Sequence, residues 1–180
     1  DDFTTKHNWS SGLANDYDSD GCHDVDEDID DDSDTILDEF DSCPRYPYNR
    51  TWISSSENDH DGDGCDNNDD DVDDDNDGLN DTQDACPKGL TNWVRDVNTD
   101  FDGDGCADAV EDDDDDNDGV FDVNATGYTL DECPKTPLNA SQVDEVGCSA
   151  TQRDSDEDGV NDAVDQCPGT PAALVVNVFG

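Results

Sequence analysis

Polar residues, above all aspartate, dominate this chain and recur at every second position over long stretches, whereas apolar stretches are short. The longest of them, Ala172 to Val176, is far too short to span a bilayer. No amphipathic helix flanks the aspartate-rich segments. The pattern therefore predicts a mostly irregular chain of loops with little regular secondary structure.

The segment from Asp59 to Pro87 shows the repeating unit most clearly. Two twelve-residue loops begin fourteen residues apart, at Asp59 and Asp73. Each has Asp at positions 1, 3 and 5, Gly at position 6, an oxygen-bearing side chain at position 9 and a carboxylate at position 12. Calcium takes about six to eight oxygen ligands, and this spacing supplies them from those five side chains and the carbonyl of position 7. Glycine at position 6 permits the sharp bend that such a site needs.

The same spacing recurs along the chain and defines seven loops, six of them in three pairs. We number them by their first residues: loop 1 at Asp16, loop 2 at Asp30, loop 3 at Asp59, loop 4 at Asp73, loop 5 at Asp100, loop 6 at Asp114 and loop 7 at Asp154. The predicted ligands of loops 1 to 3 are Asp16, Asp18, Asp20, Cys22, Asp24 and Glu27, then Asp30, Asp32, Asp34, Ile36, Asp38 and Asp41, then Asp59, Asp61, Asp63, Cys65, Asn67 and Asp70.

The predicted ligands of loops 4 to 7 are Asp73, Asp75, Asp77, Leu79, Asp81 and Asp84, then Asp100, Asp102, Asp104, Cys106, Asp108 and Glu111, then Asp114, Asp116, Asp118, Val120, Asp122 and Asp131, then Asp154, Asp156, Asp158, Val160, Asp162 and Asp165. Among all these residues, those at position 7 contribute only a backbone carbonyl: Cys22, Ile36, Cys65, Leu79, Cys106, Val120 and Val160.

Two loops depart from the pattern. Loop 2 has Thr35 at position 6, so we expect a strained, weaker site that loses its ion first. In loop 6, position 12 falls on Ala125, inside an insert from Val123 to Thr129. Asp131 stands in the equivalent place relative to the Cys-Pro end and is the expected closing ligand of that loop.

Asp28, Asp71 and Asp112 each precede the second loop of a pair by two residues. They extend the alternation of aspartates, so neighbouring loops could share these carboxylates or use them to hold an additional ion. Simple exposure to solvent is the other interpretation of these three residues, and the sequence leaves both open.

Charge and composition exclude an ordinary globular core. The 180 residues include 53 acidic residues against 7 Lys and Arg, for a net charge of −46, and only 30% are hydrophobic. Charge repulsion and the shortage of apolar surface would leave such a chain disordered unless other forces order it. We expect bound cations and disulfides to replace the core. The charge also argues against nucleic acid as a partner, because phosphates would be repelled.

Cysteines and glycosylation motifs indicate an extracellular or cell-surface protein. Eight cysteines at repeating intervals predict disulfides and hence an oxidising compartment. Five Asn-x-Ser/Thr motifs are candidate glycosylation sites: Asn8, Asn49, Asn80, Asn124 and Asn139. No signal peptide is visible and both ends interrupt the repeating pattern, from which we expect a mature product or an internal fragment.

The run Asp-x-Asp-x-Asp-Gly-x-x-Asp-x-x-Asp-x-Cys-Pro, at Asp73 to Pro87 and Asp154 to Pro168, resembles the thrombospondin type 3 repeat, in the version of prokaryotic surface proteins. The resemblance implies an elongated, disulfide-stapled series of calcium loops without a hydrophobic core. It also implies that each Cys-Pro cysteine pairs with the next cysteine: Cys43 with Cys65, Cys86 with Cys106 and Cys133 with Cys148. From the residues alone, about 105 connectivities of the eight cysteines remain open.

We expect four repeats, at residues 1–44, 45–87, 88–134 and 135–180, the last with one loop and an apolar tail. The expected function is structural: a glycosylated rod stiffened by about seven calcium ions, serving as a stalk, a spacer or a filament subunit. Cys22 and Cys167, left over at opposite ends, could join copies head to tail or could both pair within a longer chain. Leu174 to Phe179 could pair as a strand with a neighbouring copy.

The alternative is an acidic protein that buffers calcium or binds mineral, which would need flexible rather than fixed carboxylates. An enzyme is not expected. His7, His23 and His60 lie in linkers or at variable loop positions, and the sequence shows no nucleophile–base pair.

Overall fold

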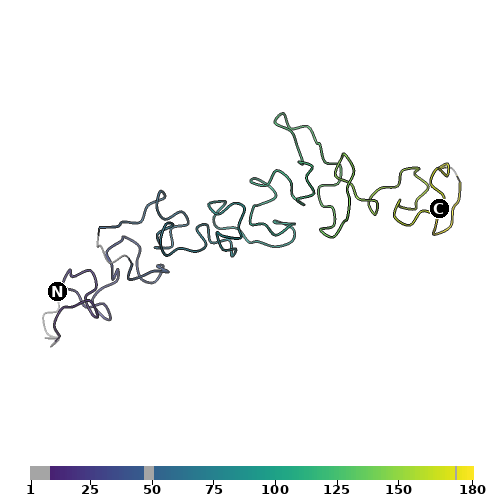
Figure 1. Ribbon diagram of the computed structural model, residues 1–180. Coiled ribbons are helices and arrows are strands. Elements are labelled where there is room, and N and C mark those ends of the chain that lie inside the picture. The colour runs from purple at the N-terminus through teal and green to yellow at the C-terminus, as the bar shows by residue number, and fades with distance from the viewer. Residues whose placement is uncertain (1–8, 47–50, 173) are drawn as a thin grey trace. The chain divides into compact units, whose positions relative to one another are not determined.

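The computed structural model describes residues 9–46, 51–172 and 174–180, and within these ranges the chain forms neither a helix nor an extended strand (Figure 1). The pairing of extended backbone in these ranges consists of two isolated antiparallel bridges, Val123 with Thr129 and Val143 with Ser149. No helix there is long and apolar enough to cross a membrane. The prediction of an irregular chain is therefore confirmed.

The chain divides into two compact units, Asp1–Thr82 and Gln83–Gly180. The first contains loops 1 to 3 and most of loop 4, and the second contains loops 5 to 7 together with the insert. His7 and the glycosylation motifs at Asn8 and Asn49 lie outside the described residues.

Three disulfides tie the loops together, with the connectivity that the resemblance implies. Cys43 is bonded to Cys65, Cys86 to Cys106 and Cys133 to Cys148, with Cα–Cα distances of 5.2, 5.2 and 5.1 Å. They close segments of 22, 20 and 15 residues, for which chain entropy gives a stabilisation of roughly 3 kcal/mol each. Cys22 and Cys167 are free thiols within this chain.

Burial is inverted relative to an ordinary globular protein. Among the described residues, the buried apolar side chains are Tyr17, Ala107 and three disulfide cysteines, whereas twelve aspartates are buried. The largest fully buried side chains are all aspartates: Asp16, Asp34, Asp59, Asp75 and Asp131. Large apolar side chains lie outside instead, as Val25, Phe40 and Val110 do at 79%, 69% and 68% exposure. Carboxylates therefore occupy the interior of this fold.

A repeated turn leads into the first loop of each pair, and it follows a tryptophan that stands seven residues before the loop: Trp9, Trp52 or Trp93. Three residues after each tryptophan, a backbone carbonyl accepts N–H bonds from the residues three and four positions later; these carbonyls belong to Gly12, Ser55 and Asp96. The residue just before each loop adds a side-chain bond to the carbonyl of the residue after the tryptophan, at 3.2, 3.0 and 2.9 Å from Asn15, Asn58 and Thr99. The turn fixes where the first carboxylate of loops 1, 3 and 5 begins.

Candidate metal sites

All seven loops share one backbone conformation at their tightest point. In every loop, positions 4 and 6 both have positive φ, between 54 and 81 degrees at position 4 and between 90 and 100 degrees at position 6. The sequence revealed position 6 through its glycines but not position 4, which is occupied by Ser19, Ser33, Gly62, Asn76, Gly103, Asn117 and Glu157. Gly and Asn accept this left-handed conformation most readily, and that preference was the available signal.

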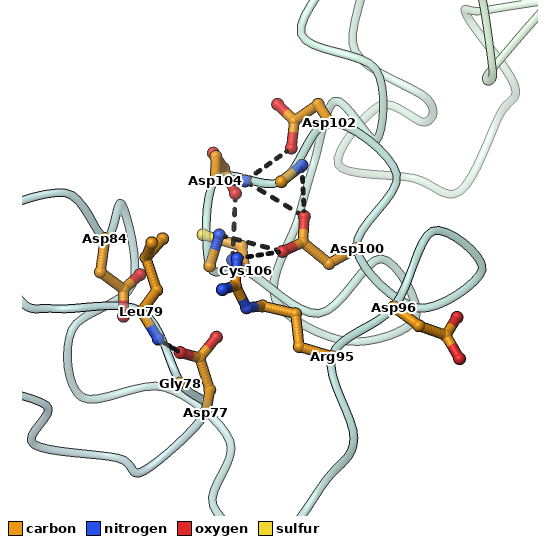
Figure 2. Close-up of polar contacts among 12 residues, drawn as sticks. Asp77, Gly78, Leu79, Asp84, Arg95, Asp96, Asp100, Asp102, Asp104 and Cys106 are labelled. Carbon is orange, nitrogen blue, oxygen red and sulfur yellow. Dashed lines mark hydrogen bonds and ion pairs between the residues drawn. The ribbon is translucent and has the colours of Figure 1, made fainter.

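This turn brings the first three carboxylates of each loop together through bonds to the loop's own backbone. In all seven loops the N–H of position 6 donates to the carboxylate of position 1, at 2.7 to 3.3 Å. The N–H of position 5 donates to position 3 at 2.9 to 3.3 Å. The N–H of position 7 donates to position 5 at 2.6 to 3.0 Å. Figure 2 shows the arrangement in loop 5, where Asp100, Asp102 and Asp104 gather around the turn.

Position 9 closes the loop from the opposite side. Its side-chain oxygen accepts the N–H of position 2 at 2.8 to 3.4 Å in every loop. Its own N–H donates to the carbonyl of the residue that precedes the loop, at 2.9 to 3.2 Å. Asn67 makes the same two bonds as the aspartates, so the loss of a charge in loop 3 leaves its geometry unchanged.

The carboxylates lie close enough to share one cation. In loops 1, 2 and 3, one oxygen from each of positions 1, 3 and 5 lies within 4.8 Å of the others. Ligand oxygens around calcium stand about 2.4 Å from the ion, so opposite oxygens are separated by about 5 Å. In addition, Asp34, Asp118 and Asp158 at position 5 each keep a buried Oδ2 that no hydrogen-bond donor of the described residues reaches. The donor set consists of hard oxygen ligands only, which suits calcium.

The pKa values of several loop carboxylates are raised because the fold buries them and places them close to one another. Burial, followed by repulsion from neighbouring carboxylates, raises the pKa of Asp32 and Asp34 to about 6 and that of Asp41 to about 7. In loop 3 the same two causes raise the pKa of Asp61 to about 6. The backbone N–H bonds that these carboxylates accept act in the opposite direction. A bound divalent cation would favour the charged form of every one of these groups.

In the second loop of each pair and in loop 7, the closing carboxylate is fixed by the cysteine that follows it. Asp41, Asp84, Asp131 and Asp165 each accept the backbone N–H of the cysteine two residues later, at 2.6, 2.6, 2.5 and 2.7 Å. Asp131 is only 1% exposed. Burial is the main cause that raises its pKa, and repulsion from Asp118, Asp122 and Asp114 raises it further. The structure thus brings Asp131 to loop 6.

The insert of loop 6 forms a small hairpin that lets the chain return. Val123 pairs with Thr129, and the N–H of Asn124 donates to the Tyr128 carbonyl at 2.9 Å. The N–H of Leu130 then donates to the Asp122 carbonyl at 2.9 Å, which places the next residue, Asp131, beside the loop. Ala125, at formal position 12, is exposed in this hairpin.

The three aspartates that precede the second loops lie with the loop before them. Asp28, Asp71 and Asp112 accept the N–H of the residue two positions later at 3.2, 3.1 and 2.9 Å, and each keeps a buried Oδ2 that no donor of the described residues reaches. Burial raises the pKa of each, and repulsion from carboxylates of the preceding loop raises it further. Asp20 and Asp18 act on Asp28, Asp63 acts on Asp71, and Asp102 acts on Asp112.

These three aspartates stand at position 13 of loops 1, 3 and 5. Each accepts the backbone N–H of the residue two positions later, as the closing carboxylate at position 12 of loops 2 and 4 does. At position 12 of the first loops, Glu27 is exposed, whereas Asp70 and Glu111 accept the N–H of position 8 at 3.2 and 3.4 Å. Both positions offer closing ligands, and the simple solvated reading of Asp28, Asp71 and Asp112 does not fit their burial.

The closing carboxylates are also held from outside by a glycine of the following segment. Asp41 lies against Gly64, Asp131 against Gly147 and Asp165 against Gly180, each so closely that a Cβ would collide with the carboxylate. Beside each contact, a backbone N–H donates to the carbonyl preceding the glycine: Ser42 to Asp63 at 2.7 Å, Glu132 to Val146 at 2.9 Å and Gln166 to Phe179 at 2.8 Å. The third case shows that the apolar tail ends on loop 7.

Three candidate glycosylation sites lie among the described residues. Asn80 and Asn139 are exposed, and Asn124 is half-buried. The side-chain oxygens of Asn80 and Asn124 each accept the hydroxyl of the threonine two residues later, at 2.8 and 2.6 Å. This bond arranges each motif as a turn at the surface.

Comparison with models of protein families gives no match to the chain, and a search of curated proteins gives no significant match either. The likeness to thrombospondin type 3 repeats therefore stays a prediction from the sequence motifs, and the metal sites are argued from the geometry of the loops.

Proposed function

We propose that this chain is a calcium-binding structural module of the extracellular space, in which each loop holds one ion and about seven ions take the place of a hydrophobic core. The observation that carries the proposal is the bonding shared by all seven loops. The same backbone hydrogen bonds gather carboxylates in each loop, and in loops 2, 6 and 7 buried oxygens remain that no donor of the described residues reaches.

The residues that would hold each ion are those at positions 1, 3, 5 and 9, the carbonyl of position 7, and the closing carboxylate. A bound calcium ion would supply two positive charges to offset the carboxylates of these positions. The chain's own contribution is to fix the oxygens beforehand through its N–H groups. Magnesium fits the sites less well, because it needs regular octahedral geometry at shorter distances.

A structural role agrees better with this arrangement than calcium buffering or mineral binding. The ligands are held by backbone bonds in a fixed register, and disulfides join successive loops. Disulfides are typical of oxidising, extracytoplasmic compartments, which supports an extracellular or cell-surface location. We propose a glycosylated stalk, spacer or filament subunit. The distance that it spans between domains or copies would be set by the number of filled loops.

Assembly into filaments would use the two ends of the chain. Cys22 and Cys167 are free within the chain, and Cys167 is exposed, so a disulfide between copies is chemically open to them in an oxidising environment. Pairing of Leu174 to Phe179 with a second copy would first require Phe179 to leave its hydrogen bond to Gln166.

Calcium removal tests the proposal directly. We expect native mass spectrometry of the disulfide-intact protein to show about seven retained calcium ions, and small-angle scattering to show loss of defined structure on chelation. Limited proteolysis should become faster in the linkers and the loops. A chain that is equally disordered with and without calcium would support buffering instead, and a chain whose structure ignores chelation would contradict the proposal.

A further inference from the structure

The few basic residues of this acidic chain are not placed at random. Three of the 7 Lys and Arg directly follow a Cys-Pro: Arg45, Lys88 and Lys135. The fourth Cys-Pro, at the end of loop 7, is followed by Gly169. Loop 7 is also the one loop that belongs to no pair. A basic residue thus accompanies each pair of loops and is missing where the pair is missing.

Arg45 lies at the junction between loops 1 and 2. Its Nε and one terminal nitrogen both lie 2.9 Å from Oδ2 of Asp31, which is position 2 of loop 2. The same terminal nitrogen lies 3.1 Å from Oδ2 of Asp24, which is position 9 of loop 1. Asp24 and Asp31 are only 7% and 5% exposed, and one oxygen of each lies within 4.8 Å of one oxygen of Asp28. The guanidinium therefore pairs with two buried carboxylates, one from each loop, in a three-carboxylate cluster that spans the junction.

Lys135 takes the corresponding position in the third pair. Its Nζ lies 2.6 Å from Oδ2 of Asp108, position 9 of loop 5, and 5.2 Å from the ring centre of Phe101. The hydrogen bond to Asp108 raises the pKa of Lys135, and the charges of Asp115 and Asp122 in loop 6 add to the effect. Asp115 is position 2 of loop 6, so the ammonium contacts position 9 of the first loop, as Arg45 does, and lies within the electrostatic influence of position 2 of the second.

We propose that the junction of a loop pair is a third cation position beside the two loop centres, sharing the position 9 carboxylate of the first loop, and that the chain fills it with its own side chain. Arg45 fills it between loops 1 and 2, and Lys135 fills it between loops 5 and 6. In the first pair, the three carboxylates of Asp24, Asp28 and Asp31 are spaced so that they would otherwise attract a divalent cation. The basic side chain therefore limits each pair to one calcium ion per loop and ties the Cys-Pro end back across both loops at any calcium concentration.

This inference rests on the proposed calcium function and is tested by counting ions. In native mass spectrometry at saturating calcium, Arg45→Met and Lys135→Met should each retain one more calcium ion than the wild type, and the double variant two more. Arg45→Lys, which keeps the charge, should retain the wild-type number. Arg153→Met is the matched control, because Arg153 pairs at 2.8 Å with Asp144, outside the loops, and both side chains are partly exposed.

An unchanged ion count in both methionine variants, with the wild type carrying its ions, would overturn this inference alone. A wild type that retains no calcium would overturn the proposed function as well. A density map of the calcium-loaded wild type gives a second test that needs no substitution. A guanidinium between Asp24 and Asp31 supports the inference, and a metal ion there with Arg45 turned to solvent refutes it.

Discussion

At the scale of single residues, the loops depend on backbone angles that few side chains accept. Position 6 of loop 2 is the clearest case, because Thr35 adopts φ 91 degrees, where the other loops have glycine. A β-branched residue in this region is strained by about 1 to 3 kcal/mol. The strain expected at Thr35 from the sequence is therefore present in the backbone, and the N–H of Thr35 still donates to Asp30 at 3.2 Å.

Replacing Thr35 by glycine should relieve this strain. We expect Thr35→Gly to raise the free energy of unfolding of the calcium-loaded protein by about 1 kcal/mol or more and to tighten calcium binding at loop 2. Calcium titration calorimetry and denaturant unfolding measure the two effects. The reverse substitution, Gly119→Thr, is the control. Gly119 has φ 95 degrees and open space around its Cβ position, so this variant should lower the free energy of unfolding by a similar amount through backbone strain alone. Equal stabilities of Thr35→Gly and wild type would show that the threonine is not strained.

Asp131 offers a second test at this scale, of the closing ligand of loop 6. Asp131→Asn keeps the size and the bond to Cys133 but removes the charge next to Asp114, Asp118 and Asp122. We expect the variant to lose the ion of loop 6 at calcium concentrations that fill the other loops, as counted by native mass spectrometry. Glu132→Gln, at the exposed neighbouring position, should keep the full number. If Asp131→Asn retains all ions, Asp131 is not the closing ligand of loop 6.

At the scale of the loop as an element, each closing carboxylate is positioned by two segments. Asp41 is fixed from inside by the Cys43 N–H and from outside by Gly64, which belongs to loop 3. The disulfide between Cys43 and Cys65 joins the same two segments. Loops 2 and 3 should therefore fill with calcium in a coupled way, because a change at Gly64 reaches the ligand set of loop 2.

Two neighbouring glycines separate this coupling from simple backbone strain. Gly62 and Gly64 both have positive φ, 78 and 90 degrees, so alanine at either costs about 1 kcal/mol from the backbone. A Cβ on Gly62 would meet nothing within 4 Å, whereas a Cβ on Gly64 would collide with the Asp41 carboxylate. We expect Gly62→Ala to weaken loop 3 alone and Gly64→Ala to weaken loops 2 and 3 together, as followed by calcium titration. Identical titrations of the two variants would argue against coupling.

The sequence predicted the parts of these elements that depend on local spacing. Positions 1, 3 and 5 could be read directly, because their carboxylates bond to backbone only two to five residues away, and Asp131 could be found from its distance to Cys133. The left-handed angle at position 4 was missed because Ser19, Asn76 and Glu157 have little in common besides that angle. The basic residues Arg45 and Lys135 can be found in the sequence by their place after Cys-Pro. The carboxylates that they contact lie 14 to 27 residues away, so local spacing does not identify them.

At the scale of the whole molecule, the charge balance makes stability depend on pH in opposite directions with and without calcium. In the calcium-free protein, carboxylates such as Asp34 and Asp41 have pKa values raised from 3.8 to about 6 and about 7. The folded state then binds protons more tightly than the unfolded state. The resulting stabilisation is complete below about pH 4 and is lost as the pH rises through about 6 to 7.

We therefore expect the chelated protein to be more compact and more resistant to proteolysis near pH 5 than near pH 8. In calcium the order should reverse, because protons compete with the ion for the same carboxylates. Scattering and proteolysis at both pH values, with calcium and with chelator, give the four measurements. A chelated protein that is more stable near pH 8 than near pH 5 would contradict the raised pKa values.

The inverted burial described above also sets how stability responds to temperature. Unfolding an ordinary domain wets apolar surface and raises the heat capacity, whereas wetting polar groups lowers it. Here the side chains to be wetted are mainly aspartates, since residues such as Val25 and Phe40 already face water. Scanning calorimetry should therefore find a heat-capacity change far below the usual 12 to 15 cal/mol/K per residue, that is, well under about 10. The stability curve would be nearly straight, without the dome that makes most proteins weaken again on cooling.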